Sequence, residues 1–174
     1  LAKMKVELDS TPKEDFKAII GCEVYVARRG DMHLKEEKVD QSGYHLILLA
    51  KNQTGYKNLI KIVSKAWTDG YYMRPRTDRK ELEKYREGLI LGGACEQGEI
   101  YQAILNGEPD ENIEKIAEFY DYLEIQPDGN NAFMLREGTV PDEDTIHEIN
   151  KIILSVADKL GKPTVATGDV HFLN

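Results

Sequence analysis

A carboxylate and an imidazole stand two residues apart near the end of the chain, at Asp169 and His171. They follow a short apolar run that begins at Pro163 and is typical of a buried parallel strand. An extended backbone directs the side chains of residues i and i+2 to the same face. The pair therefore offers a hard anionic oxygen beside an imidazole nitrogen, which are ligands that a divalent metal ion uses.

Three other residues of ligand type lie in or next to separate apolar runs. Glu23 lies within one strand-like run, His45 opens a second, and Cys95 follows a third. Carboxylate, imidazole and thiolate are the set that holds zinc or manganese. Because no sequential spacing links these residues, they can meet only if the strands lie side by side. A structural role for each residue is the alternative that the spacing leaves open.

The elements that must position these residues alternate along the chain. Strands are expected at 19–27, 44–50, 89–91, 122–126 and from Pro163. Helices are expected after a Thr54 cap, from an Asp78 cap to Gly88, and at 96–106, 110–120 and 142–160. Gly161 ends the last helix. In the first strand, Val24 and Val26 share one face, and Glu23 faces the other way. This order predicts an α/β fold with mostly parallel strands and outer helices.

Composition sets the outer bounds on function. The 174 residues suffice for one domain with a real core, and the net charge of −8 argues against strong binding of a phosphate backbone by this chain alone. Two cysteines are too few for a disulfide framework, and no apolar run approaches the roughly 18 to 20 residues that cross a bilayer. We therefore expect a cytoplasmic protein without a membrane partner. Its first and last residues suggest a segment excised from a longer chain.

Seven runs of the sequence resemble one family. They are IGCEVY at 20–25, YHLILLAKN at 44–52, GYKNL at 55–59, RPR at 74–76, LEKYREGLI at 82–90, ACEQGE at 94–99 and VATGDVHFL at 165–173. Together they resemble the polymerase-and-histidinol-phosphatase (PHP) domain of the bacterial replicative DNA polymerase III α subunit. The resemblance covers residues 17–174 of a single domain segment and leaves 1–16 as an unmatched lead-in.

This resemblance implies a distorted seven-stranded (β/α) barrel with up to three metal ions at the carboxyl ends of its strands. The ions would be zinc or manganese, with magnesium as a further candidate. Asp169 would be the catalytic carboxylate that bridges ions and positions the nucleophile. The positions that match the family's metal ligands are Glu23, His45, Cys95, Asp169 and His171.

The sequence departs from the family pattern ahead of Glu23. The family begins with a His-x-His pair, followed by an aspartate and a further histidine, and residues 1–15 contain no histidine. About four ligands, and with them the first two strands, are therefore expected to be missing. An incomplete ligand set binds metal weakly, so we expect a partial barrel with weak or absent metal binding and no catalysis by the chain alone.

The two halves resemble different branches of the family. Only 21 residues separate Glu23 from His45, as in the branch that lacks an internal exonuclease. The run 119–127 is closer to the branch that carries one. A divergent natural protein and a composite chain both remain open.

The functional expectation is a segment of a DNA-directed DNA polymerase whose PHP site has metal-dependent 3′–5′ exonuclease activity in some relatives. Its partners would be DNA, through the parent polymerase, and the rest of the α subunit. One alternative is a metal-free scaffold that docks an exonuclease subunit, and another is a free-standing phosphoesterase of the same fold.

Basic residues interleave with aromatic ones in the segment 57–79. This pattern is found where proteins contact single-stranded DNA, although aromatic residues packed on the barrel would give the same pattern. The aromatic residues are Trp67, Tyr71 and Tyr72, and the basic candidates for nucleic-acid binding are Lys61, Lys65, Arg74 and Arg76.

Overall fold

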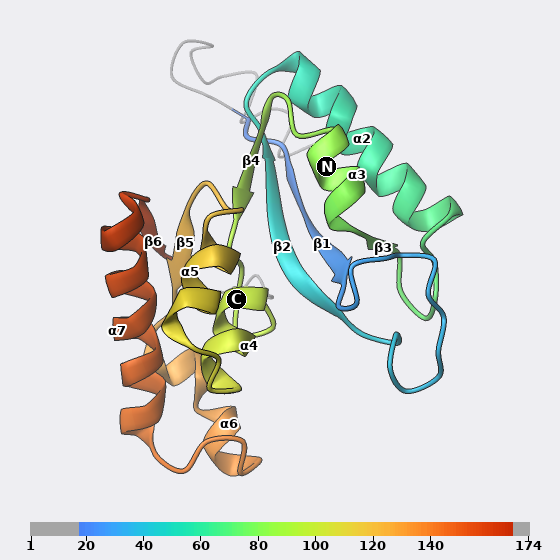
Figure 1. Ribbon diagram of the computed structural model, residues 1–174. Coiled ribbons are helices and arrows are strands. Elements are labelled where there is room, and N and C mark those ends of the chain that lie inside the picture. The colour runs from blue at the N-terminus through green and yellow to red at the C-terminus, as the bar shows by residue number, and fades with distance from the viewer. Residues whose placement is uncertain (1–17, 169–174) are drawn as a thin grey trace, which may run out of the picture.

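The computed structural model describes residues 18–168. Its elements, in chain order, are β1 (Gly21–Ala27), β2 (Gly43–Ala50), α2 (Gln53–Thr68), β3 (Arg76–Thr77), α3 (Arg79–Lys84), β4 (Leu89–Gly92), α4 (Glu99–Leu105), α5 (Asp110–Ala117), β5 (Leu123–Ile125), the 3₁₀ helix η1 (Asp128–Asn131), α6 (Phe133–Arg136), α7 (Glu143–Leu160) and β6 (Thr164–Ala166) (Figure 1). The expected strands and long helices are all present. The short elements β3, η1 and α6 were not expected.

The strands form a wall that runs through the middle of the molecule. A four-stranded sheet has the order β3-β1-β2-β4, and a two-stranded sheet pairs β5 with β6. A parallel bridge between Gly92 and Tyr122 joins the two sheets, and the Gly93 amide donates to the Tyr122 carbonyl at 3.2 Å. Helices α2 and α3 lie beside β1 and β2, whereas α4, α5 and α7 lie on the side of β5 and β6 (Figure 1).

The strand directions correct the expectation of a mostly parallel sheet. β1 pairs with β2 in antiparallel fashion, and so does β2 with β4, whereas the β1–β3 and β5–β6 pairs are parallel. The segment between β1 and β2 contains no helix, so the chain returns directly instead of crossing over to start a parallel neighbour. The described residues are thus a mixed α/β fold with an open wall, and a seven-stranded barrel is not confirmed.

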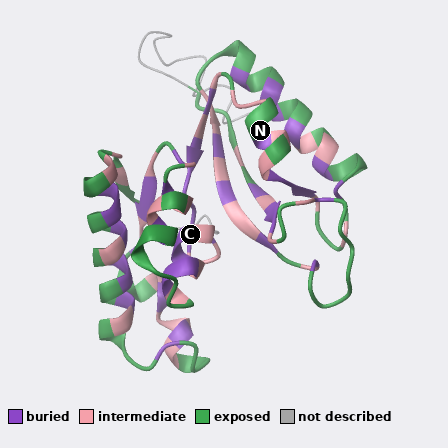
Figure 2. Ribbon diagram, viewed as in Figure 1, coloured by how far each residue is buried: buried purple, intermediate pink, exposed green. Residues whose placement is uncertain are grey.

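The core forms on the face of β1 and β2 that turns toward α2. The predicted alternation in β1 is confirmed, because Val24 and Val26 are buried and lie opposite Leu46 and Tyr44 of β2. In Figure 2, buried positions alternate along these strands and recur along one side of α2 and α7. Burial of each large apolar side chain contributes about 1.5–3 kcal/mol to the free energy of unfolding.

Side-chain caps set the helix starts. Asp78 and Asp142 cap α3 and α7 as predicted, but α2 is capped by Asn52, whose side chain accepts from the Gly55 amide, and not by Thr54. At the end of α7, Gly161 has the left-handed φ of 63° that glycine tolerates best. None of the helices in residues 18–168 is long and apolar enough to cross a membrane.

Arg76 holds the long loop between β1 and β2 in place. Its side chain is fully buried, and its guanidinium donates to the backbone carbonyls of Asp40, Met32 and Leu34, each at 2.9 Å. A fourth bond, at 3.3 Å, reaches the carbonyl of Gly70 beyond α2. One buried cation thereby satisfies carbonyls from two separate segments.

Replacement of Arg76 by leucine should therefore lower the free energy of unfolding by about 2–4 kcal/mol, because buried carbonyls lose their donors. Urea denaturation measures this loss. The exposed Arg136 offers a matched control, and Arg136→Leu should change stability by less than about 0.5 kcal/mol. Equal effects of the two substitutions would contradict the role given to Arg76.

The same loop carries an acid-sensitive contact at Asp40. The Arg29 guanidinium bonds to this buried carboxylate and holds its pKa below the ordinary value of 3.8, helped by the Glu36 amide at 2.8 Å. A pKa that is lower in the folded state means that the ionised carboxylate stabilises the fold above about pH 3.8, and that this contribution is lost as the pH falls further.

Asp40→Asn should therefore destabilise the protein clearly at about pH 7 and much less at about pH 3. Denaturation of both proteins at the two pH values checks this. A difference in stability that stays constant across the range would show that ionisation of Asp40 does not contribute.

Candidate metal centre

The register between β1 and β2 brings Glu23 and His45 together. Tyr25 lies directly opposite His45, and Glu23 lies opposite Ile47, so all four side chains share the face that turns away from the α2 core. Glu23 and His45 are diagonal neighbours on this face, within reach of one another. The Tyr25 ring meets the His45 ring edge-on, with centroids 5.0 Å apart, and limits where the imidazole can turn.

A tight turn after β4 brings Cys95 to the same place. Because β4 is antiparallel to β2 and ends with Gly92 opposite Ile47, the chain that leaves β4 runs toward the start of β2. The Gly98 amide closes the turn on the Cys95 carbonyl at 2.8 Å, and the His45 amide donates to the Gln97 carbonyl at 3.0 Å. A Cβ at Gly98 would lie 2.2 Å from the Gly93 carbonyl oxygen, so the turn needs glycine there.

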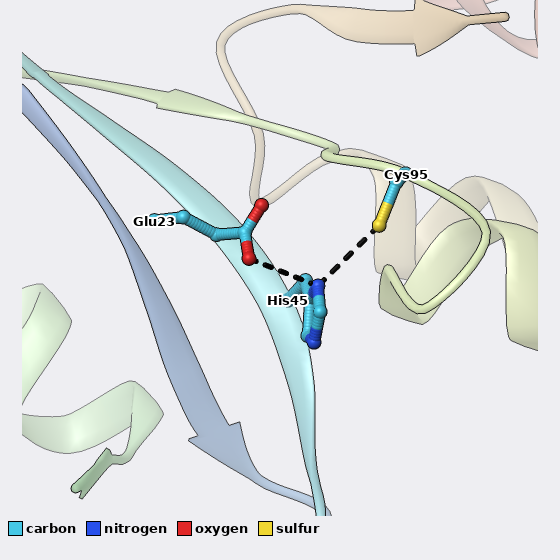
Figure 3. A group of neighbouring side chains, drawn as sticks. All are labelled: Glu23, His45 and Cys95. Carbon is cyan, nitrogen blue, oxygen red and sulfur yellow. Dashed lines mark hydrogen bonds and ion pairs between the residues drawn. The ribbon is translucent and has the colours of Figure 1, made fainter. Parts of the chain in front are cut away.

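Three ligand atoms converge at the His45 ring (Figure 3). His45 Nδ1 lies 3.1 Å from a Glu23 carboxylate oxygen and 3.4 Å from the Cys95 sulfur, and one ligand atom from each residue falls within 4.8 Å of the others. A tetrahedral zinc ion with bonds of about 2.0–2.3 Å holds its ligand atoms about 3.3–3.8 Å apart. The two separations from Nδ1 are close to that spacing and the third is within 4.8 Å, so the three residues are suited to bind one ion.

The His45 ring is the point that the other two residues share. Nδ1 can donate to the Glu23 carboxylate or accept from the Cys95 thiol, depending on the tautomer. A divalent ion would use the nitrogen, the oxygen and the sulfur together. The structure thus contains a triad capable of binding a metal ion.

The triad is open to solvent on one side. The Glu23 side chain is 41% exposed and that of His45 is 21% exposed, whereas Cys95 is buried. An ion held here would keep positions for further ligands on the Glu23 side. Cys22 points to the opposite face, as predicted, and burial, together with the neighbouring Glu23 carboxylate, raises the pKa of its thiol.

The predicted catalytic residue Asp169 and the predicted ligand His171 lie outside the described residues. The two residues just before them are held by specific contacts. Thr167 Oγ1 donates to Glu124 at 3.0 Å, and Asn130 donates to the Gly168 carbonyl at 2.7 Å.

Sequence reasoning missed Tyr25, which contacts His45, and the buried carboxylate of Glu124, which contacts Thr167. Glu124 lies in β5 with only 9% exposure, and its Oε1 has no hydrogen-bond partner among the residues described. Burial and this carboxylate together raise the pKa of the Tyr122 hydroxyl. An acidic residue inside an otherwise apolar strand was the available signal for Glu124, whereas Tyr25 is identified only by the strand register.

The four basic residues predicted to contact nucleic acid differ in their burial and in their side-chain partners. The prediction is wrong for Arg76, because its guanidinium is buried and bonded to carbonyls. Lys65 pairs with Glu81 at 2.8 Å, and Lys61 lies over the Tyr85 ring at 5.2 Å. Arg74 is exposed.

Comparison with known proteins identifies the family. The family model described as "PHP domain" matches residues 4–128. The chain belongs to the PHP domain family. The match includes β1, β2 and β4, and with them all three residues of the triad.

Curated relatives carry the same domain as a small part of a large polymerase. The chain is 51% identical over 131 residues to the DNA polymerase III PolC-type of Clostridium perfringens, and 48% identical over 131 residues to that of Bacillus subtilis. Each alignment covers 75% of this chain and 9% of the polymerase. The PolC-type enzyme of Oceanobacillus iheyensis is 38% identical over 144 residues, 82% of this chain and 10% of that protein. The chain thus spans about a tenth of the length of these relatives.

The triad makes a direct prediction for zinc binding. Cys95→Ser should lower the affinity for Zn²⁺ by at least about tenfold, because a thiolate ligand is replaced by a weakly coordinating hydroxyl. Isothermal titration calorimetry measures the change. Cys22→Ser removes a thiol from the other face of the same sheet and should leave the affinity unchanged. If both serine variants lose affinity equally, or neither does, the triad is not the zinc site.

Proposed function

We propose that this chain is the PHP segment of a PolC-type replicative DNA polymerase III α subunit, and that its triad is part of a metal-dependent phosphodiester-hydrolysing site. The similarity to PolC-type polymerases supports the parent protein. The convergence of Glu23, His45 and Cys95 is the observation that supports the metal site. DNA and the rest of the α subunit are then its partners.

Zinc is the metal that best suits the described ligands, because thiolate and imidazole favour it over harder cations. Manganese is the second candidate, and magnesium suits only sites richer in oxygen. When bound, such ions supply Lewis acidity for the attack of water on a phosphodiester. His45 and Cys95 would hold an ion from the wall, and Glu23 would supply an anionic oxygen on the open side. Asp169 and His171 remain the proposed additional ligands, with Asp169 also positioning the nucleophile.

The open wall fits a partial barrel. We expect it to be one part of the (β/α) barrel that the family resemblance implies. With about four of the expected ligands missing, the chain alone should bind metal weakly and have no turnover.

Incubation with a labelled single-stranded oligonucleotide and Mn²⁺ tests the expectation that the isolated chain has no nuclease activity. No nucleotide release is expected, and release that is abolished by Asp169→Asn would prove the expectation wrong.

Elemental analysis of the parent polymerase tests whether the proposed metal site binds metal. We expect bound metal that is reduced by a double His45→Ala, Cys95→Ser substitution. A parent without metal would favour the alternative of a metal-free scaffold that docks an exonuclease subunit.

A further inference from the structure

Two aromatic rings at the end of α2 are exposed and stacked on each other. Trp67 is 58% exposed and Tyr71 is 46% exposed, so neither ring is buried against the wall. Their ring centroids lie 5.6 Å apart with an interplanar angle of 18°. An exposed pair of stacked aromatic rings offers flat apolar surface on which a planar ligand can stack.

The loop after these rings presents a cation. Met73 has a left-handed φ of 61°, and the Tyr72 amide donates to the Arg74 carbonyl at 3.0 Å, which closes a tight reversal. This reversal directs the exposed Arg74 toward β1. Arg74 Nη1 donates to the Tyr25 hydroxyl at 2.6 Å, and the guanidinium lies 4.9 Å from the centre of the Tyr25 ring.

This surface is continuous with the metal triad. The Tyr25 ring contacts both Arg74 and His45. A cavity of about 80 Å³ is lined by Glu23 and Tyr25 from the strand and by Trp67 from the helix. A base does not fit inside so small a space, so a ligand would lie across its mouth. Trp67, Tyr25 and Glu23 thus border one hollow, and Arg74 contacts the same Tyr25 side chain.

We propose that Trp67, Tyr71 and Arg74 form a binding surface for single-stranded nucleic acid, with bases on the rings and a backbone phosphate at Arg74. Aromatic faces accept any base, and a cation beside them accepts the phosphate that links two bases, which is how proteins bind single strands without reading sequence. That the end of a bound nucleic acid reaches the triad rests on the function proposed above. Binding at Trp67, Tyr71 and Arg74 does not depend on that function.

The charges nearby set the conditions for binding. Lys65 is neutralised by Glu81 and Arg76 is buried, so Arg74 is the main cation at this surface. The Glu23 carboxylate lies close to the phosphate path and repels a phosphate until a cation offsets it. Binding by the isolated chain is therefore weak, strongest at low salt, and increased by a divalent ion at the triad.

Trp67 is the only tryptophan in the chain, so its fluorescence reports on this surface alone. Titration with oligothymidylate at low salt and in EDTA should quench it, because a base stacks on the indole. Tyr71→Ala and Arg74→Gln should each weaken binding by roughly tenfold, and Arg74→Lys should restore part of the loss by keeping the charge. Circular dichroism checks that each variant is folded.

Two matched variants serve as controls. Tyr56→Ala removes an exposed ring from the same helix, about 16 Å away along its axis, and Arg136→Gln removes an exposed guanidinium on α6. Both should bind like the unmodified chain. Absence of quenching, or equal losses in test and control variants, would overturn the proposal. Because EDTA removes metal from the experiment, failure of the metal site would leave this binding intact, and the two proposals can fail separately.

Discussion

The antiparallel pairing of β2 with both β1 and β4 is the constraint on which the site depends. It places Glu23 diagonally across from His45 on one face, and it directs the chain that leaves β4 toward the start of β2, where Cys95 contacts the same imidazole. A slip of one residue between β1 and β2 would move Glu23 to the α2 face and Val24 out of the core. Burial of the apolar face therefore fixes the position of the ligands on the other face.

The rest of the molecule stabilises this arrangement from both sides. Arg76 fastens the loop that joins β1 to β2, so the two strands can keep their register without a helical crossover. On the far side, the Asp121 carboxylate accepts from the Leu91 amide at 2.8 Å and from Arg86 at 2.9 Å, which ties β4 to the start of β5. Helix α7 packs against α4, α5 and β5 and supports that half of the wall.

Local pattern predicted the elements well, because each depends on residues close in the chain. The apolar run at 44–50 became β2, and Asp142 and Gly161 bound α7 as expected. Strand direction was mispredicted, since alternating elements suggest crossovers, whereas the segment between β1 and β2 has none. The cap of α2 was also mispredicted as Thr54, because threonine and asparagine are both common capping residues and the local pattern favours neither Thr54 nor Asn52.

For the site too, the sequence predicted residue types but not the contacts that depend on segments far apart in the chain. Glu23, His45 and Cys95 were named from their residue types and their positions at separate strands, and the resemblance to the PHP family then favoured a ligand role over the structural role that spacing left open. Their convergence needs a strand register and a turn that no single segment reveals. For Arg76, residue type suggested a surface cation, but burial depends on carbonyls that lie far away in the chain. Exposure of Trp67 likewise could not be read from a helical pattern that fits a packed aromatic equally well.

X-ray absorption at the zinc edge tests the central claim most directly, with the measurement made on the zinc-loaded Cys22→Ser protein so that Cys95 is the only cysteine left. Convergence of the three side chains on one ion predicts one sulfur neighbour at about 2.3 Å, together with nitrogen and oxygen neighbours at about 2.0–2.2 Å. A spectrum fitted by nitrogen and oxygen alone, with no sulfur at bonding distance, would contradict it.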